Sequence, residues 1–178
     1  VTLNYTVSGT SWTLSVSRTG VEESHGSYTY TAPSTTCYIF LGATPARAAN
    51  WGIWVDNFSI TAGGVTYTDN FNTGESKLFT DNVNCATYYY EAPETEEPEV
   101  EGEGHAIASF KSLPENKLSI VTTNAYSNIT SMQVDVYVPA ANTENHWWGF
   151  VPVASTSGDA YTGSDGSSGN FNINQILV

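Results

Sequence analysis

The stretch that decides the fold is residues 50–60, Asn-Trp-Gly-Ile-Trp-Val-Asp-Asn-Phe-Ser-Ile. Its apolar and polar residues alternate with a period of two, which is typical of a β-strand. Strict alternation places one set of side chains on the same side of the strand: Trp54, Asp56, Phe58 and Ile60. Asp and Asn are unfavourable inside strands, and their burial is costly unless they are hydrogen-bonded. We therefore expect hydrogen-bond partners for Asp56 and Asn57.

Composition indicates that the rest of the chain is β-structure as well. The 178 residues are enough for a substantial core, and they are rich in Thr, Ser, Asn, Gly and Tyr. No stretch of about 12 residues keeps a helical apolar period without Gly, Pro or a cluster of β-branched residues. These features predict an all-β protein that folds as an antiparallel β-sandwich.

Alternating segments predict the individual strands. Residues 2–7 and 12–17 alternate around a short turn at Gly9, which predicts a hairpin with a hydroxyl-rich outward face. In the second half, the clearest predicted strand spans residues 129–139. One face of that strand carries Met132, Val134, Val136 and Val138, and the other carries Gln133, Asp135 and Tyr137.

The negative charge of the chain is concentrated in one segment. The formal net charge is −13, and seven of the eighteen acids lie in residues 91–104. This segment also contains Pro and Gly but no aromatic residue, so we expect a mobile acidic loop. We predict one domain over residues 1–178 that contains this loop, and two half-modules, residues 1–90 and 105–178, are the alternative.

Charge and cysteine content restrict the partners and the location. Only five Lys and Arg residues are available to contact phosphate, which argues against nucleic acid and against an anionic membrane surface. No apolar run reaches the about 18 residues of a membrane span, so we expect no membrane insertion. Cys37 and Cys85 form one disulfide or remain two separate thiols. The expected location is extracellular or at the cell surface.

Residues 50–60 resemble the closing strand of extracellular jelly-roll modules of the laminin-G/concanavalin type and of several carbohydrate-binding module families. In those modules, a Trp- or Tyr-rich approach leads to the ending hydrophobic-Asp-Asn/Asp-hydrophobic-x-hydrophobic, which Val55 to Ile60 match. The resemblance implies a jelly roll. In such modules this strand comes last, whereas here it comes early and Asp69-Asn70-Phe71 follows it. We therefore hypothesise a circularly permuted strand order, or a chain cut across two tandem modules.

The same resemblance implies a structural Ca²⁺ near the terminal strands. Asp56, Asp69 and Asn70 are the ligands that it would select, because Ca²⁺ is bound by hard oxygen atoms. The alternative is that these side chains cap the backbone of loops. We expect no other cofactor.

The sequence does not contain the pattern of a catalytic site. Its composition also resembles small jelly-roll xylanases, which need two carboxylates that face each other across a cleft. Outside the acidic loop, only Asp56 and Asp135 lie in the middle of predicted strands, and neither lies in a motif of that family. His25, His105 and His146 are isolated, so we expect neither a nucleophilic triad nor a zinc site. We predict that the protein is not an enzyme.

Residues 145–150, Asn-His-Trp-Trp-Gly-Phe, are the best candidate for binding a sugar. Sugar rings have apolar faces and hydroxyl edges, so their sites need exposed aromatic rings beside polar groups. Trp147 and Trp148 are adjacent on a predicted strand, so they point to opposite faces and at least one lies outside the core. We favour Trp147 as the outward one, and the reverse is the alternative. The predicted carbohydrate site comprises Trp147, Trp148, His146, Tyr137, Asp135, Gln133 and Trp51.

The leading hypothesis is a noncatalytic carbohydrate-binding module that recognises a glucan, such as starch or a plant cell-wall glucan. The acidic segment resembles linkers in surface proteins of gut bacteria that degrade fibre and starch, which implies a larger multidomain protein of a bacterial polysaccharide-degrading system. The alternative is an adhesin, pilus or surface-layer subunit that assembles by strand exchange, because predicted strands reach both ends of the chain.

Overall fold

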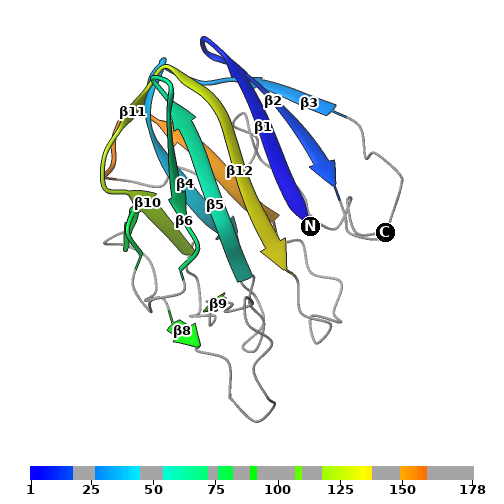
Figure 1. The fold of residues 1–178 in the computed structure, drawn as a ribbon, viewed down its shortest axis with the longest axis vertical. Coiled ribbons are helices and arrows are strands. Elements are labelled where there is room, and N and C mark those ends of the chain that lie inside the picture. Colours follow the sequence, from blue (N-terminus) through cyan, green and yellow to red (C-terminus); the bar gives the residue numbers. More distant parts are fainter. Residues whose placement is uncertain are drawn as a thin grey trace.

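The computed structural model describes residues 1–17, 27–44, 54–71, 76–81, 89–91, 107–109, 118–137 and 149–159. These residues form antiparallel β-sheets and no helix, which confirms the prediction of an all-β sandwich (Figure 1). Accordingly, none of them belongs to a helix that is long and apolar enough to cross a membrane.

The larger sheet has six strands in the order β3-β2-β1-β12-β5-β6. Their bounds are Ser27–Thr31 for β3, Ser11–Ser17 for β2, Thr2–Ser8 for β1, Ile129–Tyr137 for β12, Trp54–Ala62 for β5 and Val65–Asp69 for β6. The predicted hairpin is formed by β1 and β2, and Gly9 in its turn has a φ of 61°. Gly63 and Gly64 join β5 to β6 with φ values of 58° and 80°, which glycine adopts without strain.

The smaller sheet packs behind the larger one in the view of Figure 1. Its path is β11-β4-β10-β7, and β13 also pairs with β4. The bounds are Tyr126–Ser127 for β11, Thr36–Thr44 for β4, Leu118–Thr122 for β10, Phe79–Asp81 for β7 and Gly149–Ser155 for β13. A separate pair consists of β8 (Tyr89–Glu91) and β9 (Ile107–Ser109).

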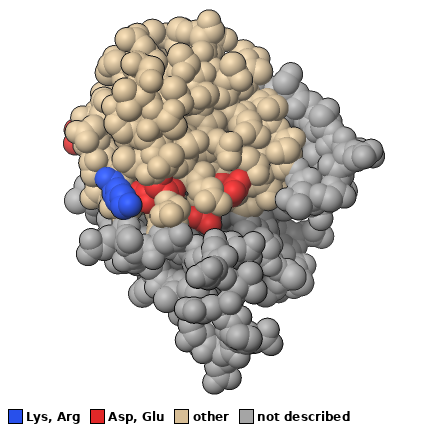
Figure 2. Space-filling view, in the orientation of Figure 1, with Lys and Arg blue, Asp and Glu red and all other residues tan. Residues whose placement is uncertain are grey.

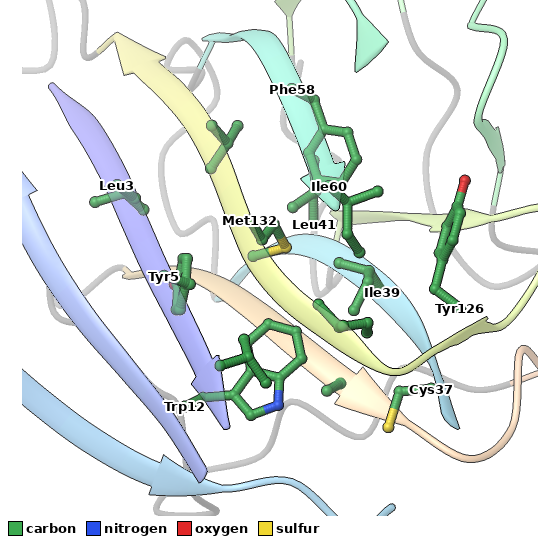
Figure 3. Packing of buried hydrophobic residues seen from close by; sticks show 14 of the residues in the cluster. Leu3, Tyr5, Trp12, Cys37, Ile39, Leu41, Phe58, Ile60, Tyr126 and Met132 are labelled. Atoms are coloured by element: carbon green, nitrogen blue, oxygen red, sulfur yellow. The ribbon is translucent and has the colours of Figure 1, made fainter. Parts of the chain in front are cut away.

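The core lies between the two sheets. It combines the inward-facing residues of β1, β2, β5 and β12 with residues of β4 and β10, including Ile39 and Leu41 (Figure 3). Trp12, on the inward face of β2, is 1% exposed. Burial of each large apolar side chain of this kind stabilises the fold by roughly 1.5–3 kcal/mol. The alternation of residues 2–17 therefore specifies one wall of the core.

Strand β12 connects the two halves of the chain. It pairs with β1 on one side and with β5 on the other, and one core cluster contains residues from both sides of the acidic segment. Residues 92–104 lie outside the described residues, and so does the predicted C-terminal strand. The single domain over residues 1–178, the jelly-roll connectivity and the permuted strand order remain predictions.

Strand β5 departs from strict alternation, so the predicted grouping of Trp54, Asp56, Phe58 and Ile60 on one side is wrong. Val55, Phe58 and Ile60 are all buried, whereas Asp56 is only half-buried. The register with β12 shifts because β5 has one extra residue opposite the step from Gln133 to Asp135. Asn57 has a φ of 47°, a left-handed conformation that Asn tolerates better than most residues. The Asp-Asn pair therefore forms a β-bulge, which returns Val55 to the core.

Thr122 completes the hydrogen bonding of β4. This strand pairs with β11 at Cys37 and with β10 from Phe40 onward, so Ile39 lies between the two ladders. The buried Thr122 Oγ1 accepts the Ile39 backbone N–H at 3.0 Å. Without this hydroxyl, the buried Ile39 N–H would lose the acceptor that satisfies it.

Tyr5 brings a phenol into the core. Its side chain is 2% exposed and packs edge-on against Trp12 and Tyr30, with ring centroids 5.9 Å and 6.4 Å away. The Tyr5 hydroxyl has no hydrogen-bond partner in the described part of the chain. Burial, and to a smaller extent the neighbouring Tyr30, raises the pKa of Tyr5 well above its ordinary value of 10.0. The hydroxyl is therefore a cost to the folded state that the aromatic packing offsets.

Candidate functional site

The outward side of the larger sheet is polar, and we call it the polar face. The hydrophobic residues of β1, β2 and β12 point to the core, so the alternate residues face outward. Those of β1, for example, are Thr2, Asn4, Thr6 and Ser8. In Figure 2 this side shows a broad surface without charged residues, and acidic residues lie along its lower margin.

Asp135 lies at the acidic end of the polar face, on the central strand β12. Its two carboxylate oxygens accept hydrogen bonds from different strands: Thr2 Oγ1 donates to Oδ1 at 2.6 Å, and Asn57 Nδ2 donates to Oδ2 at 3.0 Å. Each oxygen keeps a further lone pair, because a carboxylate offers about four acceptor sites. Asp135 is therefore held in place and remains able to accept a hydrogen bond from a ligand hydroxyl.

Asp56 is the direct partner of Asp135 in the register of β5 and β12. Side chains at such positions are roughly 4.5–5.5 Å apart at Cβ, and two like charges there repel each other. The bulge at Asn57 reduces this repulsion in two ways. The Asn57 backbone N–H donates to Asp56 Oδ1 at 2.7 Å, and the Asn57 side chain donates to Asp135. Asp56 and Asn57 therefore have hydrogen-bond partners, as expected from the sequence: Asn57 donates to both Asp56 and Asp135.

The two acids of this pair lie on neighbouring strands of one sheet. A glycosidase pair instead flanks the scissile bond, with a separation of about 5–5.5 Å across a cleft for retention. The arrangement supplies anionic acceptors beside hydroxyl and amide groups on an open face, which suits hydrogen bonding to a polyhydroxylated ligand.

Gln133 occupies the middle of the polar face. It lies opposite Asn4 on β1 and Ser59 on β5, and Asn4 Nδ2 donates to Ser17 Oγ at 3.5 Å. Gln133 and Asn4 are both half-buried, and each amide provides both donors and acceptors. Sequence analysis identified Gln133 and Asp135 but missed Asn4, Thr2 and Asn57 as their neighbours. The hydroxyl-rich hairpin face was visible in the sequence, but its pairing with β12 was not.

The remaining residues of the predicted carbohydrate site cannot be placed in the same way. Tyr137 ends β12 opposite Trp54, and its side chain is not described. Trp147, Trp148, His146 and Trp51 lie outside the described residues. Their contribution to a carbohydrate site remains a prediction.

Asp69 has a structural environment of its own. It is 2% exposed at the end of β6 and lies opposite the buried Phe58. Its Oδ1 accepts the Phe71 backbone N–H at 3.1 Å. Its Oδ2 accepts three hydrogen bonds, from Ser76 Oγ at 2.6 Å and from the backbone N–H groups of Lys77 at 2.7 Å and Leu78 at 3.0 Å. This is the loop-capping role that sequence analysis gave as the alternative to calcium binding.

The three predicted calcium ligands do not converge on one face. Asp56 lies beside Asp135 on the polar face, whereas Asp69 is on the core side of the sheet and Asn70 is exposed next to it. The described residues contain no group of three His, Cys, Asp or Glu that could hold a metal ion. Calcium binding remains a prediction, and both carboxylate oxygens of Asp69 already accept hydrogen bonds from protein groups.

Cys37 is a buried free thiol in the structure, and Cys85 lies outside the described residues. The Cys37 Sγ donates to the Ser34 carbonyl at 3.1 Å. Burial raises the pKa of the Cys37 thiol, and the hydrogen bond to Ser34 opposes part of this rise. The thiol is therefore protonated at neutral pH and a poor nucleophile.

Comparison with known proteins gave no relative from which a function could be transferred. No family model matches the chain, and no curated protein and no solved structure matches it either.

Proposed function

We propose that the protein is a noncatalytic carbohydrate-binding module whose polar face contacts a neutral polysaccharide of the glucan type. The observation that carries this proposal is the position of Gln133 and Asp135 on the central strand of a surface rich in hydroxyl and amide groups. Sugar hydroxyls both donate and accept hydrogen bonds, so they are matched by amides, hydroxyls and a carboxylate held ready to accept.

The charge distribution supports a neutral ligand. Lys77 is the only Lys or Arg among the described residues, and Asp56 and Asp135 are the acids of the polar face. An anionic polymer would find no Lys or Arg among the described residues of the polar face, and the net charge of −13 would repel it. The predicted aromatic platforms Trp147, Trp148 and Trp51, with His146 beside them, belong to the proposal as additional contacts to the apolar faces of the sugar rings.

The proposal includes an extracellular or cell-surface location, because soluble polysaccharide and plant cell wall are found there. It assigns no catalytic group: the Asp56–Asp135 pair serves as hydrogen-bond acceptors. The resemblance of residues 50–60 to carbohydrate-binding jelly-roll modules supports the same function.

The experiment is affinity electrophoresis in gels that contain starch, β-glucan or xylan. We expect retardation by at least one neutral polymer, and we expect Gln133→Ala to weaken it while the melting temperature stays nearly unchanged. Thr80→Val is the matched control, because Thr80 is an exposed residue of β7 in the other sheet. Migration without retardation in all three gels would refute the proposal.

A second candidate function, assembly with other chains by strand addition, is favoured by β6, the outermost strand of the larger sheet among the described residues. Val65 and Tyr67 are 52% and 38% exposed, and they are the exposed large hydrophobic residues of the described part of the chain. Strand β6 also lacks the Lys, Pro or bulge that natural edge strands use against pairing. Light scattering after size exclusion tests this candidate: assembly predicts oligomers that Tyr67→Lys dissociates, and a wild-type monomer at high concentration contradicts it.

A further inference from the structure

A continuous row of hydroxyl groups crosses all six strands of the larger sheet. Thr6 on β1 lies directly opposite Thr13 on β2 and Ser131 on β12. The row continues outward in the same register, since Thr13 pairs with Thr29, Ser131 with Thr61, and Thr61 with Thr66. We call this set the hydroxyl row: Thr29, Thr13, Thr6, Ser131, Thr61 and Thr66.

The hydroxyl row is open to solvent and keeps hydrogen-bonding capacity. Thr29, Thr6, Ser131 and Thr66 are exposed, and Thr13 and Thr61 are half-buried. Two pairs are within hydrogen-bond distance, with Oγ1 atoms 3.4 Å apart for Thr13–Thr29 and 2.9 Å apart for Thr61–Thr66. A hydroxyl has one donor and two acceptor positions, so each pair retains free positions for a ligand.

A second polar row lies parallel to the first. It comprises Ser15, Asn4, Gln133, Ser59 and Thr68, which are also direct partners across neighbouring strands. Neither row contains a charged or an aromatic residue. Together they form an uncharged strip, two side chains wide, that crosses the strands in the centre of the polar face.

The spacing of the strip favours one direction for a bound polymer. Neighbouring strands are about 4.8 Å apart, so six strands span roughly 24 Å across the sheet. Along a strand, same-face side chains recur only every ~6.7 Å. One pyranose ring in an extended chain is about as long as the spacing between strands. A chain that crosses the strands therefore meets a hydroxyl at each sugar, whereas a chain that follows a strand does not.

We propose that the hydroxyl row is the binding track for an extended, neutral, β-1,4-linked polysaccharide that lies across the strands and contacts all six of them. This inference rests on the proposed carbohydrate-binding function and adds the direction, the linkage type and the length of the bound chain. A β-1,4-linked chain is straight and ribbon-like and follows a row of this kind. The coiled α-1,4-linked chain of starch leaves such a row after a few sugars.

The test removes hydroxyls from the two ends of the row. Thr29→Val and Thr66→Val keep the β-branched shape that strands prefer and delete one hydroxyl each. They lie five strand spacings apart, so only a ligand that crosses the sheet can contact both. Binding of cellohexaose and maltohexaose is measured by calorimetry for the two single variants, the double variant and the control Thr80→Val.

We expect each single variant to weaken cellohexaose binding about threefold to tenfold and the double variant to combine both losses. The control should bind like the wild type. Circular dichroism checks folding, and Thr6→Val in the centre of the row replaces any end variant that fails to fold.

The outcomes separate this inference from the function on which it rests. Cellohexaose binding that is unchanged in all row variants, or weakened by only one end of the row, would overturn the crossing track and leave carbohydrate binding intact. Binding of maltohexaose alone would overturn the linkage. Failure of every neutral oligosaccharide and polymer to bind would refute the proposed function itself, and the track with it.

Discussion

Replacing Asp69 with Asn should strongly destabilise the protein, because Asp69 is a buried carboxylate that holds Phe71 and the segment 76–78 through hydrogen bonds. It accepts four hydrogen bonds, one at Oδ1 from Phe71 and three at Oδ2 from the segment 76–78. An Asn side chain at this position can place its carbonyl oxygen where Asp69 has Oδ2, so that the three donors keep an acceptor, although it is now uncharged. Its NH₂ group then lies where Asp69 has Oδ1 and faces the Phe71 N–H, which is also a donor.

The magnitude follows from these contacts. Hydrogen bonds to a charged group contribute roughly 1 kcal/mol more than neutral ones, so three weakened bonds cost about 3 kcal/mol. The buried N–H of Phe71 loses its acceptor, which costs about 1–2 kcal/mol more. We therefore expect Asp69→Asn to lower the free energy of unfolding by about 4 kcal/mol.

Urea unfolding followed by tryptophan fluorescence measures this change, with an unchanged dependence on urea concentration. Asp159→Asn is the matched control, because Asp159 is exposed and accepts from Ser157 Oγ at 3.1 Å, and it should cost less than about 0.5 kcal/mol. A loss of less than about 1 kcal/mol in Asp69→Asn would refute the capping role. If a chelator destabilised the wild type but not Asp69→Asn, calcium would be the partner of this carboxylate instead.

Three further substitutions test the core. Tyr5→Phe removes a buried hydroxyl without a described partner, so we expect the variant to be more stable at neutral pH by about 1 kcal/mol in urea unfolding. A decrease of the free energy of unfolding by about 1 kcal/mol would instead mean that the hydroxyl is hydrogen-bonded. Burial raises the pKa of Tyr5 and Tyr30, so the unfolded chain loses these protons before the folded protein does as pH rises past 10.0, and the free energy of unfolding should fall there. In Tyr5→Phe this fall should be shallower by up to ~1.4 kcal/mol per pH unit. Equal slopes in the wild type and Tyr5→Phe would contradict the raised pKa of Tyr5. Thr122→Val leaves the Ile39 N–H without its acceptor and should cost about 1–3 kcal/mol, whereas a neutral result would show that this N–H has another partner. Leu14→Ala empties a position that is 0% exposed and should cost about 3 kcal/mol by thermal or urea unfolding; a cost below about 1 kcal/mol would place Leu14 outside the core.

Local pattern was sufficient for three strands of the larger sheet, β1, β2 and β12. The period of two in residues 2–7, 12–17 and 129–139 predicted these strands, because side-chain direction alternates in a regular strand, and Met132, Val134 and Val136 share a buried face as predicted. The same rule failed at Asn57, where a residue with positive φ inserts an extra position into β5. The sequence signal for this bulge was the Asp-Asn pair, because Asn adopts a positive φ more readily than most residues. The alternation of apolar and polar residues did not indicate a bulge there.

The site was harder to predict than the strands, because its residues meet only through pairing over long sequence distances. Thr2 and Asp135 form their hydrogen bond across 133 residues, and the hydroxyl row depends on five separate registers. Single-strand periodicity fixes which face a Thr occupies but not which Thr lies beside it. Gln133 and Asp135 could therefore be identified as outward, whereas the position of Asn4 and Asn57 beside them could not be predicted.

The central place of β12 has a consequence for synthesis of the chain. On the ribosome, the hairpins β1–β2 and β5–β6 emerge long before their common neighbour, so β1 and β5 wait with unpaired backbone groups until residue 137 has been translated. Contacts of such long range form slowly. During that interval the nascent protein presents two open edges to other chains, so we expect the incomplete chain to aggregate more readily than the completed fold.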